Sequence, residues 1–439
     1  RARCSCSADR PNTPTSCGRP PSLTRSAIQA APALLSSASP FRVRIGGATT
    51  ADKLTILGRD GDDTMKASSV DGTIRIELSG GDGNDFLSAD ATLIGGTGSD
   101  TLEGGSGSDS MTGGDGDDVF LLTANNGGGT DTVVGGNGND SILVQGGQGN
   151  DTITFGDAAG DFTVTVGGVT TTYALPESSF EQIEAEGAGG NDTIDASAIT
   201  TGVAVTLRGG DGDDRLTDGA SDDRLEGGDG NDIVNIFTGA DDRDTAVGAH
   251  GDDVIVYRDT PRTNRIDGNE GFDRLQYLGL DTDDDLRVAL GGDQFISRAG
   301  GSVTADFGTI ESITIFTEGE TAEDRVTILT AAESDVRVLS VAVSNTAGSN
   351  RVVVEGSPDA ETLNFGDDNI GGFQILGFVT KIGLFSEDAA DTLEIRGNAG
   401  NDSITQTTTS PINVILDGGD GDDFLSADAT LNGGAGDDF

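Results

Sequence analysis

The sequence predicts an all-β solenoid, in which short strands alternate with tight glycine-rich turns. A nine-residue unit with Gly at positions one, two and four, Asp at position six and a large apolar residue at position eight recurs through the chain. Runs between these units alternate apolar and polar residues with a period of two, as half-buried strands do. Only 5% of the residues are aromatic and there is no Trp, so a broad globular core is hard to build.

The unit is clearest between Gly95 and Leu121, where three copies follow one another without a gap. Their apolar eighth residues are Leu102, Met111 and Phe120, which we interpret as rungs of the core. A second uninterrupted trio runs from Gly209 to Asn235. Because one isolated copy is weak evidence and many tandem copies are strong, these blocks fix the interpretation of the whole chain.

Changes in composition divide the chain into six segments. Residues 281–390 lose the nine-residue unit but keep short β-rich runs, and we expect either further solenoid coils or a small sandwich there. The chain begins without Met and ends at Phe439 inside a unit, so we expect a fragment of a longer protein. The predicted segments are a disordered tail or linker at 1–40, a first repeat block at 41–160, a β-hairpin and strand insert at 161–186, a second repeat block at 187–280, the β-rich region at 281–390, and the truncated start of a further block at 391–439.

A formal net charge of −49 excludes several classes of partner. Nucleic acids and anionic membrane surfaces would be repelled by a surface of this sign. No stretch approaches the roughly 18 apolar residues of a membrane-spanning helix. Such a composition fits either a disordered acidic linker with no metal role or a repeat structure whose charge is neutralised by cations. The periodic Gly and Asp favour the second interpretation.

Stacking the units brings carboxylates close together. If two units make one coil, each unit stacks on the next but one, and successive position-six Asp residues lie roughly 4.8 Å apart. Two carboxylates at that distance repel by about 1 kcal/mol in water and several times more at an effective dielectric constant of about 20. A hard divalent cation between the coils turns this repulsion into a net attraction. Oxygen ligands from Asp and backbone carbonyls are those that Ca²⁺ prefers. We therefore expect several Ca²⁺ ions.

On these repeats the sequence resembles the RTX, or haemolysin-type calcium-binding repeat, family. The resemblance implies a parallel β-roll in which carbonyls and the Asp of one turn share an ion with those of the turn one coil on. It also implies export by a type I secretion apparatus. Carried onto this chain, the shared ligands are Gly96, Gly98 and Asp100 with Gly113, Asp115 and Asp118, and Gly210, Gly212 and Asp214 with Gly227, Asp229 and Asp232.

Further metal ligands are expected at position six of the other units, namely Asp85, Asp109, Asp140, Asp151 and Asp423. Asp100 and Asp118 should face each other one coil apart across an ion, whereas Asp109 should lie on the opposite edge of the solenoid. The interruption at Leu122 to Asn125 leaves the partner of Asp109 open.

These features predict calcium binding by a secreted or cell-surface protein with a structural, adhesive or surface-layer role, and with a cell-surface or matrix partner. The alternative is the repeat region of a larger exported enzyme or toxin, such as a protease, lipase or haemolysin, whose catalytic part lies outside this stretch. We expect no enzyme within the stretch, because its one histidine, His250, cannot make an H-E-x-x-H site and no G-x-S-x-G is present.

Overall fold

The computed structural model divides into two compact units, Arg1–Leu207 and Arg208–Phe439, which are described separately. The predicted tail at 1–40 lies outside the described residues apart from β1 (Thr15–Cys17) and β2 (Ser26–Ala27). Besides these strands and β3 (Val43–Ile45), the structure describes residues 53–67, 75–123, 129–158, 161–166, 169–174, 181–200, 202–237, 243–258, 264–279, 285–290, 294–298, 303–317, 324–330, 336–343, 349–367, 373–376, 380–385, 390–408, 410 and 412–439.

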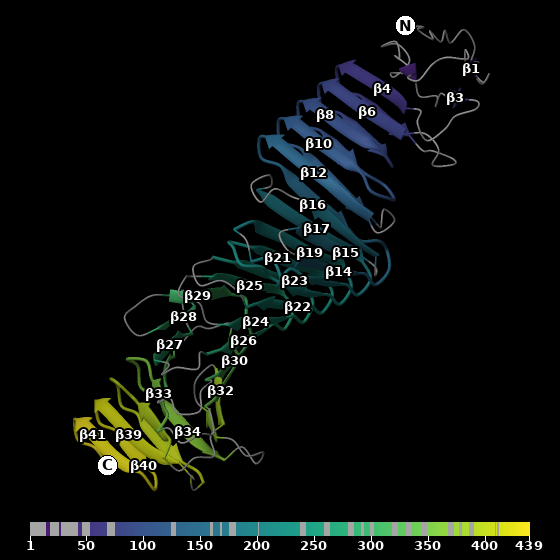
Figure 1. Cartoon of the computed structure of the whole chain (residues 1–439). Coiled ribbons are helices and arrows are strands. Elements are labelled where there is room, and N and C mark those ends of the chain that lie inside the picture. Colours follow the sequence, from purple (N-terminus) through teal and green to yellow (C-terminus); the bar gives the residue numbers. More distant parts are fainter. Residues whose placement is uncertain are drawn as a thin grey trace. The chain divides into compact units, whose positions relative to one another are not determined.

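In unit 1 the strands alternate along the chain between two sheets, which we call sheet 1 and sheet 2 of that unit (Figure 1). Sheet 1 contains β4 (Lys53–Asp60), β6 (Arg75–Asp82), β8 (Thr92–Thr97), β10 (Ser110–Asp115), β12 (Gly129–Asn137), β14 (Thr152–Ala158), β15 (Asp161–Val166), β16 (Val169–Ala174) and β18 (Thr193–Asp195). Sheet 2 contains β5 (Thr64–Ala67), β7 (Phe86–Ala89), β9 (Thr101–Glu103), β11 (Val119–Thr123), β13 (Ser141–Gln145) and β17 (Gln182–Gly189).

Neighbouring coils of unit 1 pair in parallel, and equivalent positions of the repeat fall side by side. Leu93 of β8 lies beside Met111 of β10, which lies beside Val133 of β12. In the opposite sheet, Leu102 of β9 lies beside Phe120 of β11. All these position-eight side chains are buried. The prediction of an all-β parallel roll with position eight in the core is therefore confirmed.

One coil of unit 1 is extended by a reversal of three strands. β14, β15 and β16 pair antiparallel in succession, while β16 pairs in parallel with β12 and β14 with β18. The predicted hairpin between Phe162 and Tyr173 is thus present, with Val166 beside Val169 across its turn. We call such a group a strand triplet. Each triplet adds two strands to one sheet and none to the other. At the usual strand spacing this lengthens that sheet by about 10 Å in the direction of stacking.

Unit 2 repeats this plan, and β19 (Ala204–Asp211) lies across the boundary between the units. Its sheet 1 contains β20 (Arg215–Thr217), β22 (Ile233–Ile236), β24 (Val254–Arg258), β26 (Arg274–Leu278), β30 (Ser312–Phe316), β32 (Val338–Ala342), β34 (Thr362–Asp367), β35 (Phe373–Leu376), β36 (Lys381–Phe385), β38 (Ser403–Gln406) and β40 (Phe424–Ser426). Its sheet 2 contains β21 (Arg224–Asp229), β23 (Thr245–His250), β25 (Asn264–Glu270), β27 (Asp285–Ala289), β28 (Phe295–Arg298), β29 (Val303–Gly308), β31 (Arg325–Leu329), β33 (Arg351–Glu355), β37 (Thr392–Arg396), β39 (Asn413–Asp420) and β41 (Thr430–Ala435).

The described strands of 281–390 are further coils of the solenoid. β30 pairs in parallel with β26 and β32, and β33 pairs in parallel with β31 and β37. Two more triplets interrupt the stack, β27–β28–β29 in sheet 2 and β34–β35–β36 in sheet 1. Of the two architectures that the sequence left open for this region, the structure has solenoid coils.

Candidate metal centre

The glycines of the repeat let the turns stack closely. Gly96 and Gly98 have φ angles of 133° and 116°, in the region that residues with a Cβ rarely enter. A Cβ added to Gly114, one coil further on, would lie 2.1 Å from the Gly96 carbonyl oxygen and overlap it. Positions two and four therefore favour glycine wherever coils stack on both sides of the turn. Degenerate turns use Arg59, Ala249 or Asn398 at φ of 99°, 89° and 74°.

The position-six carboxylates of unit 1 bond coil to coil. The backbone N–H of Asp100 donates to Oδ1 of Asp118 at 2.8 Å, and that of Asp118 donates to Oδ1 of Asp140 at 3.0 Å. In the same way, the N–H of Asp85 donates to Oδ1 of Asp100 at 2.8 Å. We call each such series an acid ladder. Asp85, Asp100, Asp118 and Asp140 thus form one ladder along the turns that precede the strands of sheet 2.

Asp109 belongs to a second ladder, along the turns that precede the strands of sheet 1. Its N–H donates to Oδ1 of Asp131 at 2.9 Å, which identifies the partner that the sequence left open. The ladder stops at the triplet and resumes beyond it, where Asp151 N–H donates to Oδ1 of Asp192 at 2.7 Å. A triplet therefore interrupts the acid ladder of the sheet that it enlarges.

The second oxygen of each carboxylate points into the structure. Oδ2 of Asp118 is buried without a hydrogen-bond partner. It lies over Gly113 of its own turn, where an added Cβ would also meet the Gly135 carbonyl oxygen of the next coil at 2.7 Å. Buried carboxylate oxygens without a hydrogen-bond partner recur at Asp63, Asp85, Asp100, Asp109, Asp232, Asp253, Asp273, Asp402 and Asp423.

In the described part of unit 2 the longest ladder follows sheet 1. The N–H of Asp214 donates to Asp232, Asp232 to Asp253, and Asp253 to Asp273, at 2.8, 2.8 and 2.9 Å. Asp423 lies in a separate ladder near the end of the chain, where Asp402 N–H donates to its Oδ1 at 2.8 Å. A Cβ at Gly209 would meet Asp214 Oδ2 and, at 2.5 Å, the Gly227 carbonyl oxygen. The trio in unit 2 thus repeats the geometry of the trio in unit 1.

Three of the predicted ligands differ from this geometry. The side chains of Asp115 and Asp229 are exposed at the rim, where Asp115 accepts from Asn137 Nδ2 at 2.7 Å and Asp229 from His250 Nδ1 at 3.0 Å. Their backbone carbonyls accept N–H groups of the preceding coil, from Gly98 at 2.7 Å and from Gly212 at 2.6 Å. Oδ2 of Asp151 accepts from Gly147 N–H at 2.5 Å, because this turn lacks the left-handed glycines of the other units.

Glutamates extend the ladders at positions that the sequence pattern missed. Asp140 N–H donates to Oε2 of Glu181 at 2.8 Å, and Asp273 N–H donates to Oε2 of Glu311 at 2.9 Å. Glu361 N–H donates to Oδ1 of Asp402 at 2.8 Å. Each glutamate follows or begins a coil that contains a triplet. The signal that could have found them is an acidic residue two positions before a buried apolar residue, such as Ile183 or Leu363.

A second series of bonds at position five was also missed. Asn139 N–H donates to Oδ1 of Asp117 at 2.8 Å, and Asn231 N–H donates to Oδ1 of Asp213 at 2.8 Å. These bonds run toward the preceding coil, opposite to those of the acid ladder. Each turn is therefore fastened to its neighbours in both directions by side chains of adjacent residues.

Burial makes the ladder carboxylates weak acids. It raises the pKa of Asp118 to about 7, with the charges of Asp100 and Asp140 adding to the effect and the backbone hydrogen bond opposing it. Burial likewise raises the pKa of Asp109 and Asp232 to about 7 and that of Asp85 to about 6. Holding these groups ionised next to one another is costly unless a cation compensates them.

The arrangement provides oxygen ligands only. Each turn contributes one buried carboxylate oxygen and lies against a carbonyl oxygen of the next coil, which suits a hard cation such as Ca²⁺. Within the described residues no group of three His, Cys, Asp or Glu side chains could hold a metal ion. Among those residues no helix is long and apolar enough to cross a membrane.

Comparison with known families agrees with this geometry. The model of the RTX calcium-binding nonapeptide repeat (4 copies) matches residues 77–92, 88–120, 125–159, 206–234 and 413–429. Over these residues the chain carries RTX-type repeats. No curated protein matches it. The RTX match covers both trios except the last residue of each, and it indicates calcium binding by the matched repeats.

Proposed function

We propose that the position-six carboxylates of this RTX-type protein bind several Ca²⁺ ions between stacked turns and that these ions order the nonapeptide coils. The observation that carries this proposal is the series of buried carboxylate oxygens without hydrogen-bond partners, at Asp85, Asp100 and Asp118 of one ladder and at Asp232, Asp253 and Asp273 of another. In the absence of metal these like charges oppose stacking, so folding of the repeat blocks is linked to ion binding. The buried Oδ2 atoms of Asp100 and Asp118 lie in successive turns of one ladder.

We further propose that the protein works outside the cell, in a structural or adhesive role and without catalysis in this stretch. Sites of this type in extracellular modules have dissociation constants of roughly 10⁻⁴ to 10⁻³ M. Such sites stay empty in a cytosol poor in calcium and fill after export. An exposed acidic surface that becomes rigid on export suits a scaffold between cells or at a cell surface.

A calcium titration tests the binding proposal. Circular dichroism should change from a largely unordered to a β spectrum at millimolar Ca²⁺, with a much weaker response to Mg²⁺, and calorimetry should show saturable uptake. The double variant Asp100→Ala and Asp118→Ala should lose about one ion and leave the Asp109 ladder occupied. An unchanged spectrum together with no calcium uptake would reject the proposal.

A further inference from the structure

Most coils between β30 and β37 lack the acid-on-acid stacking of the repeat blocks. At position six, sheet 1 has Glu311, then Arg337, then the buried Thr380, whose Oγ1 donates to the Val336 carbonyl oxygen at 2.6 Å. The ladder of sheet 2 has Asp324, Asn350 and Asp391 in succession, with the N–H of each donating to the next at 3.0 and 2.9 Å. A cationic or neutral residue therefore separates the carboxylates within these two series. The exceptions are the pair of Glu361, which precedes β34, with Asp402, and the pair of Asp273 with Glu311 where these coils begin.

The turns of these coils also lack the backbone that cradles an ion. Among the described residues between Gly271 and Gly400, only Thr309 and Asn398 have a φ angle in the left-handed region. Left-handed glycines are what allow turns of the repeat blocks to stack with their carbonyls against the next carboxylate. Apart from the pair of Glu361 with Asp402, these coils lack both the stacked carboxylates that require a cation and the turn that binds one.

Their strands on sheet 2 bury more apolar surface than those of the repeat. β31 buries Val326 and Ile328, and β37 buries Leu393 and Ile395. The repeat strand β21 buries one large apolar side chain, Leu225, although on sheet 1 the repeat strands β22 and β24 bury two each. Because the hydrophobic contribution scales with the apolar area removed from water, packing alone holds sheet 2 together more strongly in these coils than at β21.

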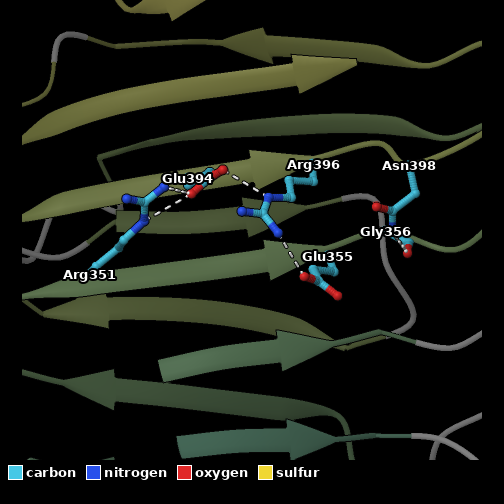
Figure 2. A network of polar contacts seen from close by, with 6 residues as sticks. All are labelled: Arg351, Glu355, Gly356, Glu394, Arg396 and Asn398. Carbon is cyan, nitrogen blue, oxygen red and sulfur yellow. Dashed lines mark hydrogen bonds and ion pairs between the residues drawn. The ribbon is translucent and has the colours of Figure 1, made fainter. Parts of the chain in front are cut away.

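Ion pairs between protein side chains take the place of a cation on sheet 2. Figure 2 shows Glu394 of β37 between Arg351 of β33 and Arg396 of its own strand. Arg351 binds Glu394 Oε2 through Nε, at 2.9 Å, and through Nη2, while Arg396 Nε donates to Oε1 at 2.8 Å. Arg396 Nη1 then reaches back to Glu355 of β33 at 3.0 Å. The Glu394 side chain is only 7% exposed, so these pairs are partly shielded from solvent.

We propose that the coils from β30 to β37 form a calcium-independent core, which stays folded without metal while the neighbouring nonapeptide coils from β20 to β24 unfold. This inference rests on the proposed function, since it holds that folding depends on calcium in the coils from β20 to β24 and does not depend on calcium in the coils from β30 to β37. In a chain moving from low to high calcium, this core would be the preformed surface on which repeat coils order.

Hydrogen exchange of the full chain, read by mass spectrometry with Ca²⁺ and with a calcium chelator, tests the inference. In chelator, amides of 312–316, 338–342, 351–355 and 392–396 should stay protected while those of 215–257 exchange at nearly unfolded rates. In calcium both sets should be protected. Fast exchange of both sets in chelator would overturn the inference but support the proposed function. Equal protection of 215–257 with and without calcium would instead overturn the proposed function.

Two variants test the ion pairs. Glu394→Gln removes the charge that holds both arginines, so in chelator the amides of 351–355 and 392–396 should exchange about tenfold faster or more. Glu226→Gln is the matched control, because it removes only the exposed pair with Arg224 at 3.2 Å and should leave those amides unchanged. Unchanged exchange in Glu394→Gln would show that the ion pairs do not hold this core.

Discussion

At the scale of single residues, each ladder aspartate uses its two carboxylate oxygens differently. Oδ1 of Asp118 accepts the N–H of Asp100, which fixes the register between coils even without an ion. Oδ2 stays buried over Gly113, without a hydrogen-bond partner. The first oxygen therefore specifies the fold, and the second makes that fold depend on what neutralises it.

The pKa shifts predict how the metal-free protein responds to pH. An unfolded Asp has a pKa of about 3.9, whereas burial raises that of folded Asp118 to about 7. Protonation therefore stabilises the folded ladder fully below the unfolded pKa, and this stabilisation is lost as the pH rises through about 7. Without calcium, the β signal in circular dichroism should be stronger at pH 5 than at pH 8. A β signal that instead grows with pH would contradict the assignment.

Calcium should reverse that dependence, because the ion competes with protons for the same oxygens. The calcium midpoint should rise as the pH falls below about 7, and the change should be smaller in Asp118→Asn, which removes one of the carboxylates with a raised pKa. Calorimetric titrations at pH 6 and pH 8 measure both quantities. The same midpoint at the two pH values would show that these carboxylates do not bind the ion.

Position one of the turn offers a steric test. A Cβ at Gly113 would overlap Asp118 Oδ2 and approach the Gly135 carbonyl oxygen at 2.7 Å. Gly113→Ala should therefore lower the stability of the calcium-loaded protein by about 1–3 kcal/mol, the usual cost of overpacking. Gly202→Ala is the control, since nothing lies within 4 Å of its added Cβ. Thermal unfolding in excess calcium compares them, and equal midpoints would rule out a crowded cradle at Gly113.

At the scale of elements, the sequence predicted the repeat coils well and their connections poorly. The eighth residue of each unit, such as Leu102 or Phe120, lies in the core as periodicity requires. The strand triplets could not be foreseen, because pairing of β16 with β12 across β13, β14 and β15 is a long-range choice that local alternation does not encode. Their effect on the ladders, including the use of Glu181, was hidden for the same reason.

The bond across the first triplet can be removed by itself. Glu181 accepts the N–H of Asp140 at 2.8 Å although 41 residues separate the two. Glu181→Ala leaves that N–H without its acceptor and should destabilise the calcium-loaded protein by about 1–3 kcal/mol. Glu181→Gln keeps an acceptor and should cost less. Chemical denaturation of both variants measures the difference, and equal losses would mean that the hydrogen bond contributes nothing.

At the scale of the whole molecule, the net charge of −49 opposes compaction until cations bind. Raising NaCl to 1 M shortens the Debye length to about 3 Å and screens distant charges, but it supplies no ion to the buried oxygens. We therefore expect salt to shrink the metal-free chain without adding β structure, and calcium to do both. Small-angle scattering measures the radius of gyration and circular dichroism measures the β content, so the two together separate the effects. A fully unfolded chain of 439 residues would have a radius of gyration of about 77 Å, which is the upper limit for the metal-free chain. Full β structure in salt alone would show that general repulsion, and not site-bound calcium, controls folding.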